Sequence, residues 1–116
     1  MKLWIDDVRP APEGYYWCKS VEEAKNTITN ANAKFADQCR KDLEPDHSLH
    51  IELIDLDHDA GDYANDGGDY IKLLDWLEWL YGGQGTYTEF RIHSMNPVGV
   101  ANMRAIIERN GWKEIR

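Results

Sequence analysis

The chain has 116 residues, five of them tryptophan, and carries a formal net charge of −8. This length and composition predict a single globular domain over residues 1–116 and exclude an intrinsically disordered chain. No apolar run approaches the ~20 residues of a membrane span, and the N-terminus lacks the apolar core of a signal peptide, so we expect a cytoplasmic protein without membrane contact.

The first part of the chain predicts two short strands followed by one long helix. Apolar runs at 2–5 and 15–18 are typical of strands, and the link between them contains two prolines and a glycine. Ser20 and Glu23 match a capping box, in which Glu23 bonds back to the start of the helix. We expect this helix to run to about Leu43, with a weak apolar stripe typical of a surface helix.

The second part alternates strands with helices. The expected elements are a strand at 50–57, a helix at 70–81, a strand at 90–93, a helix at 98–110 and a strand at 112–116. Asn96 is the expected cap of the last helix, and Gly111 is expected to end it. This order predicts an α/β fold with a parallel five-stranded sheet and helices on both faces. The pairing of the second strand stays open, because its short link also suits an edge strand.

Polar side chains follow three of the predicted strands at the point where each strand ends. Asp6 and Asp7 come after the first strand, Asp57 and His58 after the third, and residues 93–96 after the fourth. In a parallel sheet the carboxyl ends of the strands meet at one edge, where ligands bind. The sequence therefore predicts that these side chains gather at a single site.

The acidity of the chain is local. Residues 55–69 contain six aspartates and no lysine or arginine, so this window carries −6 of the −8 and leaves −2 for the rest. Close carboxylates repel one another, and they usually indicate a cation, a shared proton or a phosphoryl group. The distribution favours a site, and the acidic balance argues against a broad nucleic-acid-binding surface.

Asp6, Asp7 and Asp57 are the candidate ligands of Mg²⁺ or Mn²⁺, because these cations take carboxylate oxygens. Asp55 is the alternative to Asp57, since side chains alternate faces and a shift of one residue in the strand end would exchange them. A calcium-binding loop is rejected because Ala60 stands where that loop needs glycine. The remaining aspartates are more typical of a solvated loop or, for the last one, of a helix cap: Asp59, Asp62, Asp66 and Asp69.

Five further residues complete the candidate site. His58 and His93 are candidate acid–base groups, because histidine titrates near neutrality. Ser94 and Asn96 precede a helix, where they can satisfy its N-terminus or bind phosphate oxygens. Arg9 can pair with the first two aspartates or hold a phosphate.

Several segments resemble the receiver domains of response regulators, which have a flavodoxin-like fold. These are "LWIDDVRP", "CKSVEEA", "LDHD" and Ser94. The resemblance implies that Asp6 and Asp7 bind Mg²⁺, that Asp57 is the phosphoacceptor-like aspartate and that Ser94 contacts the phosphoryl group. Receivers carry a lysine after the fifth strand, whereas Lys113 lies inside the expected strand here. The link between the first two strands is also too short for the usual first helix.

The combination of "DDVRP", "LDHD" and "HSMNP" is similar to a divergent receiver-like family named for cyclic-phosphate processing, whose members are proposed enzymes linked to RNA repair. This likeness implies a receiver-like sheet with the first helix reduced or missing. It also implies a metal-dependent phosphoesterase that opens 2′,3′-cyclic ends of RNA or nucleotides, with either water or Asp57 as the attacking group. The alternatives are a single-domain receiver that accepts phosphate on Asp57 and a non-catalytic phosphate- or nucleotide-sensing domain. A haloacid-dehalogenase-type phosphatase is less favoured, because too little chain follows Asp55-x-Asp57 for that fold.

Overall fold

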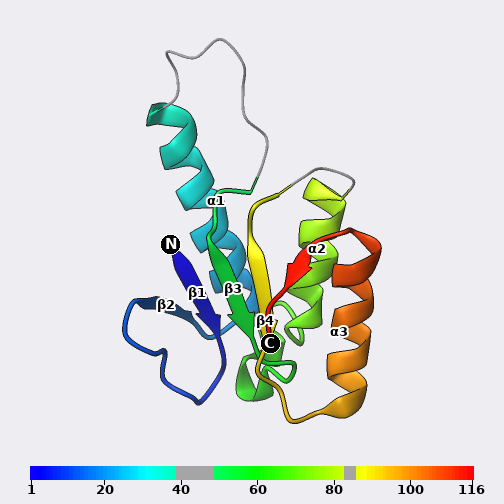
Figure 1. Cartoon of the computed structure of the whole chain (residues 1–116). Coiled ribbons are helices and arrows are strands. Elements are labelled where there is room, and N and C mark those ends of the chain that lie inside the picture. Colours follow the sequence, from blue (N-terminus) through cyan, green and yellow to red (C-terminus); the bar gives the residue numbers. More distant parts are fainter. Residues whose placement is uncertain (39–48, 83–85) are drawn as a thin grey trace.

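A computed structural model describes residues 1–38, 49–82 and 86–116. Its elements are β1 (Lys2–Ile5), β2 (Tyr15–Cys18), α1 (Val21–Gln38), β3 (Leu53–Leu56), the 3₁₀ helix η1 (Gly61–Asn65), α2 (Ile71–Tyr81), β4 (Glu89–Ile92), α3 (Pro97–Arg109) and β5 (Lys113–Glu114). Each pair of neighbouring strands is parallel, and the strands lie in the order β2-β1-β3-β4-β5 (Figure 1). This arrangement confirms the predicted receiver-like sheet and places β2 at its edge.

The helices of the described chain lie on one face of the sheet, in a layer with α2 between α1 and α3 (Figure 1). The prediction placed helices on both faces, with the first helix reduced or missing. The difference follows from the short link between β1 and β2, which provides a loop where a receiver has its first helix. We call the other side the open face; its side chains are Lys2, Trp4, Tyr15, Trp17, Leu53, Asp55, Glu89, Arg91 and Lys113.

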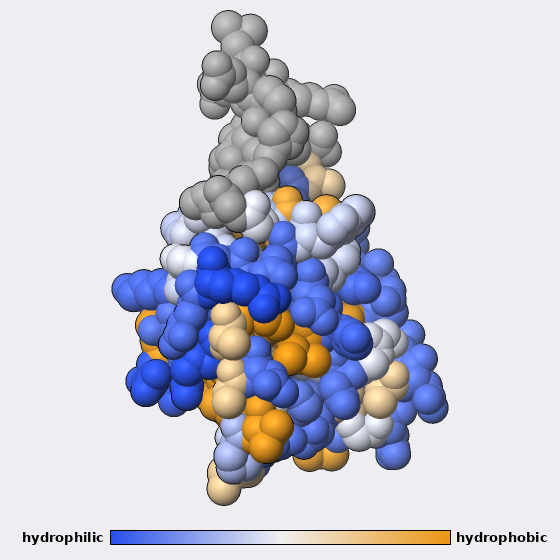
Figure 2. All heavy atoms as spheres, turned by 90° about the vertical axis from the view of Figure 1, so that its right-hand side faces the viewer, coloured by the Kyte–Doolittle hydropathy of each residue, from blue (hydrophilic) through white to orange (hydrophobic). Residues whose placement is uncertain are grey.

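The core fills the space between the sheet and the helix layer. Leu3 and Ile5 of β1, with Ile54 and Phe90 of the neighbouring strands, have no exposed surface and point toward the helices. Leu77 of α2 is equally buried. Figure 2 shows the surface from the side of α3, where small apolar patches lie between hydrophilic side chains. Apolar burial on this scale is the main source of stability in a domain of this size.

Local details differ from the sequence prediction at three places. Ser20 accepts a hydrogen bond from the backbone N–H of Glu23, as expected, but the Glu23 carboxylate accepts from Lys19 N instead of Ser20 N. The third strand begins at Leu53 rather than at residue 50, because Glu52 N already bonds to Met1 O outside the ladder. Asp69 does not cap α2: its carboxylate accepts from Ala60 N and closes the η1 loop.

The termini of α3 agree with the prediction. The side chain of Asn96 accepts a hydrogen bond from Gly99 N, and Pro97 occupies the first turn. Gly111 follows the helix with a φ of 68°, a left-handed conformation that favours glycine. The predicted end of α1 near Leu43 lies outside the described residues. Cys18 is a free, fully buried thiol. No described helix is long and apolar enough to cross a bilayer.

Glu78 ties α2 to the end of α3. Its carboxylate accepts from Nε and Nη2 of Arg109 at 2.6 and 2.7 Å and also from the Asn110 amide. These hydrogen bonds, with that of Arg109 the strongest, lower the pKa of Glu78 from 4.5 to about 2. Because the folded pKa is depressed, the stabilisation is present above the unfolded pKa and is lost as the pH falls from 4.5 toward 2.

We therefore expect Glu78→Gln to lower the melting temperature at pH 7 by roughly 2–5 °C. The difference from the wild type should shrink as the pH is lowered from 5 toward 2, because the unfolded carboxylate takes up a proton below about 4.5 and the folded one only near 2. Melting curves followed by circular dichroism over this range test the prediction. A constant difference at all pH values would contradict it.

Candidate functional site

The carboxyl ends of β1 and β3 bring three aspartates together at one edge of the sheet. Carboxylate oxygens of Asp6, Asp7 and Asp57 all lie within 4.8 Å of one another. The register aligns Ile5 of β1 with Leu56 of β3, so the residues that follow each strand are neighbours. We call these three residues the carboxylate cluster. Their oxygens are hard ligands of the kind that Mg²⁺ and Mn²⁺ bind, so the residues present fit such a cation.

Asp6 is the fully buried member of the carboxylate cluster. Its Oδ1 accepts from the backbone N–H groups of Val8 and Arg9 at 3.0 and 2.9 Å, which fixes the loop after β1. Its Oδ2 lies 2.8 Å from Nε2 of His93. Burial opposes ionisation, but these hydrogen bonds more than offset it, and the pKa of Asp6 is lowered. Asp6 is therefore a fixed carboxylate at neutral pH.

Asp7 is half-buried, and it lies against the η1 loop. A Cβ added at Gly61 would come within 2.3 Å of Asp7 Oδ2, and Gly61 has a φ of 55°, so glycine is required there on both counts. Burial and then the neighbouring charges of Asp6 and Asp57 raise the pKa of Asp7. The cluster thus contains a carboxylate repulsion that a divalent cation would relieve.

We expect Asp7→Asn to raise the free energy of unfolding in EDTA by roughly 0.5–1 kcal/mol, because it removes this repulsion. The same substitution should remove most of the stabilisation that the wild type gains from Mg²⁺. Thermal melts with EDTA and with a Mg²⁺ series measure both effects. Asp62→Asn, an exposed aspartate of η1, is the charge-matched control and should change neither. An Asp7→Asn protein that loses stability in EDTA would contradict the prediction.

His93 lies between two buried carboxylates. Its Nδ1 is 2.6 Å from Asp55 Oδ1, and its Nε2 is 2.8 Å from Asp6 Oδ2. The ring stacks on Trp4 with the centroids 3.9 Å apart, which leaves 11% of the side chain exposed. Burial lowers the pKa of His93, but the hydrogen bonds with Asp55 and Asp6 outweigh it and raise the pKa. Both ring nitrogens are therefore engaged, and the ring is favoured as a cation.

His58 has a different environment. Its Nδ1 lies 2.7 Å from Asp59 Oδ1, and within the described chain its Nε2 forms no hydrogen bond. The ring packs on the first turn of α3, where a Cβ at Gly99 would lie only 2.4 Å from it. A side chain at position 99 would therefore displace the histidine. Of the two predicted acid–base histidines, His58 has the ring nitrogen that is available for proton transfer.

The three predicted phosphate-binding residues lie after β1 and β4. Ser94 Oγ accepts from Asn96 N at 3.1 Å, and Asn96 Oδ1 accepts from Gly99 N, so both have the structural role at the helix N-terminus. The Arg9 side chain is exposed and donates to His93 O at 3.4 Å. Their contact with a phosphate remains a prediction.

The structure gives different positions to the alternatives Asp55 and Asp57. Asp57 is half-buried, belongs to the carboxylate cluster and accepts from His58 N at 2.7 Å. Asp55 is 2% exposed on the open face and holds His93. Of the loop aspartates, Asp66 accepts from Ser20 Oγ at 2.6 Å and joins the loop to α1. The sequence prediction missed the contributions of Trp4, Gly61 and Gly99, although a glycine beside a polar strand end is a usable signal for close approach.

A family model described as the cyclic-phosphate processing receiver domain matches residues 1–109. No curated protein matches the chain. No solved structure matches it either.

Proposed function

The chain belongs to the family of cyclic-phosphate processing receiver domains, and from this premise we propose that it is a metal-dependent phosphoesterase that opens 2′,3′-cyclic phosphates. The observation that supports the proposal most is the carboxylate cluster at the carboxyl ends of two neighbouring strands. A phosphoryl group needs charge compensation there, and three carboxylates can provide it only by holding a cation.

Asp6, Asp7 and Asp57 would hold Mg²⁺ or Mn²⁺. When bound, the cation supplies neutralisation of the phosphate charge and lowers the pKa of a bound water molecule. Asp6 is pre-positioned by Val8 N, Arg9 N and His93, so its carboxylate needs no reorganisation. Asp7 is held against Gly61, and Asp57 is oriented by His58 N.

His58 would move the proton. In the tautomer that donates Nδ1–H to Asp59, the Nε2 lone pair is available to take a proton from the attacking water. The resulting imidazolium can then deliver that proton to the ribose oxygen that leaves phosphorus. One P–O bond forms to water and one ring P–O bond breaks, which gives a phosphomonoester. His93 would act as a positioning residue, because both its ring nitrogens already bond to carboxylates.

The exposed polar groups at the same edge would hold the non-bridging oxygens of the phosphate. The exposed guanidinium of Arg9, three residues after Asp6, can bond to two oxygens at once. The N-terminus of α3, with Ser94 and Asn96, presents dipoles that favour an anion.

The reaction is tested by ³¹P NMR of an oligoribonucleotide that ends in a 2′,3′-cyclic phosphate, with Mg²⁺ or Mn²⁺. We expect the wild type to remove the cyclic signal and Asp57→Ala to leave it intact. The product resonance identifies which ring oxygen leaves. A cyclic signal that the wild type leaves unchanged from pH 6 to 8 would refute the proposed activity.

A second candidate function is a receiver that accepts phosphate on Asp57. It is favoured by one observation: the His93 imidazolium provides a cation beside Asp6. Incubation with acetyl phosphate and Mg²⁺, followed by intact mass measurement, distinguishes the two. Stable addition of one phosphoryl group to the wild type but not to Asp57→Ala would support the receiver.

A further inference from the structure

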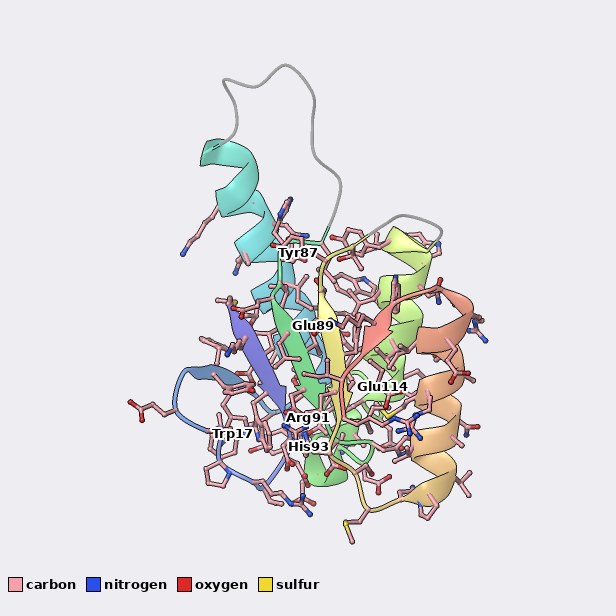
Figure 3. The ribbon with its side chains drawn as sticks, in the orientation of Figure 1. Trp17, Tyr87, Glu89, Arg91, His93 and Glu114 are labelled. Atoms are coloured by element: carbon pink, nitrogen blue, oxygen red, sulfur yellow. The ribbon has the colours of Figure 1, made fainter. Side chains whose placement is uncertain are left out.

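The open face of the sheet carries a row of aromatic side chains. Trp4 of β1 is level with Trp17 of β2, and both side chains are half-buried. Tyr15 makes an edge contact with Trp4, with the ring centroids 6.0 Å apart. Figure 3 shows Trp17, Arg91 and His93 in front of the sheet, with the helices behind. Parts of these rings therefore face solvent.

Cations accompany these aromatic rings. Lys19 Nζ lies 4.5 Å from the ring centroid of Trp17, and Lys2 Nζ lies 5.7 Å from that of Tyr15. Arg91 of β4 is exposed on the same face, and its side chain forms no ion pair with other described residues. Arg9 lies beside the site, where its guanidinium donates to His93 O. Lys2 also pairs with Glu52, whose Oε1 lies 4.0 Å from Lys2 Nζ. The open face thus combines aromatic surfaces with the positive charges of Lys19, Arg91 and Arg9.

Each carboxylate of the open face lies beside a positively charged side chain, although the chain as a whole has a net charge of −8. Asp55 is paired with His93, and Glu89 lies 3.3 Å from Lys113 Nζ. The net acidity comes from the loop after β3, outside this face. A polyanion that approaches the open face therefore meets Lys19 and Arg91, whose side chains form no ion pair with other described residues.

The composition of this face decides which class of partner fits it. A docked helix or second sheet would need exposed aliphatic side chains, and the aliphatic member of the face, Leu53, is only 7% exposed. Aromatic rings with nearby cations suit unpaired nucleobases and their phosphates, because bases stack on the rings while the cations contact the backbone.

The open face is continuous with the candidate site. Trp17 Nε1 donates to Asp6 O at 2.7 Å, and Trp4 stacks directly on His93. A strand that lies on the aromatic row would therefore direct its end toward the carboxylate cluster.

We propose that the open face binds single-stranded RNA, with its 3′ end in the carboxylate cluster. Bases stack on Trp17 and Tyr15, and phosphates contact Lys19 and Arg91. The identity of the end group rests on the proposed function, since a 2′,3′-cyclic phosphate requires ribose. Binding relies on stacking and a few phosphate contacts, so its salt dependence should be weaker than that of a protein with a broad basic surface.

The test is fluorescence anisotropy of a 5′-labelled hexaribonucleotide with a linear 3′-phosphate, measured with Mg²⁺, because this end has no ring that could be opened. We expect Trp17→Ala and Arg91→Glu each to weaken binding at least fivefold. Two matched variants of the helix layer, Trp79→Ala and Lys34→Glu, should bind like the wild type, because both side chains are exposed on α2 and α1. Circular dichroism shows whether each variant is folded. If Trp17→Ala is unfolded, the exposed substitution Arg91→Glu still tests the proposal.

The outcome is independent of the activity assay. RNA binding that is absent in the wild type, or unchanged in Arg91→Glu, would overturn the inference even if the cyclic phosphate is opened. Binding that depends on Trp17 and Arg91 would support it even if the cyclic phosphate stays intact, and would then leave the proposed activity as the part that fails.

Discussion

Replacing His93 by alanine should lower the free energy of unfolding by about 3–5 kcal/mol. Asp6 has no exposed surface and Asp55 is 2% exposed, and the imidazolium between them bonds to both at 2.8 and 2.6 Å. Removal of this cation leaves two buried carboxylates without their charge partner. The loss of the stacking contact with Trp4, 3.9 Å away, adds to the cost. Urea denaturation at pH 7 measures the change.

Two further variants separate charge compensation from simple loss of packing. His58→Ala removes a half-buried histidine whose partner Asp59 is exposed, so it should cost less than about 1 kcal/mol. Asp55→Asn combined with His93→Gln keeps a hydrogen-bonding pair without charge. It should be less destabilised than the sum of the two single substitutions, because the residues form one network. A His93→Ala protein within 1 kcal/mol of the wild type would show that the buried carboxylates do not need this cation.

The pairing of His93 illustrates which part of the site sequence reasoning can reach. The rule that polar residues gather at the carboxyl ends of parallel strands was enough to bring Asp6, Asp7 and Asp57 to one edge. The partners of His93 depend on the register of three strands and on side-chain rotamers, which no local pattern encodes. Sequence therefore nominated His93 as an acid–base group, whereas the structure engages both its nitrogens.

The fold shows the same limit at the level of elements. Apolar runs and caps located the strands and helices to within a few residues, because periodicity and capping are local signals. Which face of the sheet the helices cover is not determined by such local signals. It follows from a nine-residue link, 6–14, that is too short to cross over the face, and this leaves β1 and β2 open on that side. The open face and the aromatic row on it were therefore visible only in the structure.

Asp57→Asn should lower the rate of cyclic-phosphate opening by about 10³-fold, because the proposed metal site loses a charged ligand. Its stability should stay within about 1 kcal/mol of the wild type. Asp57 is half-buried at the rim, and its hydrogen bond from His58 N at 2.7 Å can be accepted by an amide oxygen. The ³¹P assay gives the rate, urea denaturation gives the stability, and the shift of the melting temperature with Mg²⁺ gives metal binding.

Asp55→Asn is the matched control for this prediction, because it removes a carboxylate two residues away. It should lower the free energy of unfolding by about 2–4 kcal/mol, since it leaves His93 with one charge partner instead of two. Its Mg²⁺-dependent stabilisation should persist, because Asp55 is outside the carboxylate cluster. Asp57→Asn should therefore reduce activity and metal binding with little change in stability, whereas Asp55→Asn should reduce stability and keep metal binding. Metal binding that is lost in Asp55→Asn and kept in Asp57→Asn would reverse the assignment and make Asp55 the metal ligand.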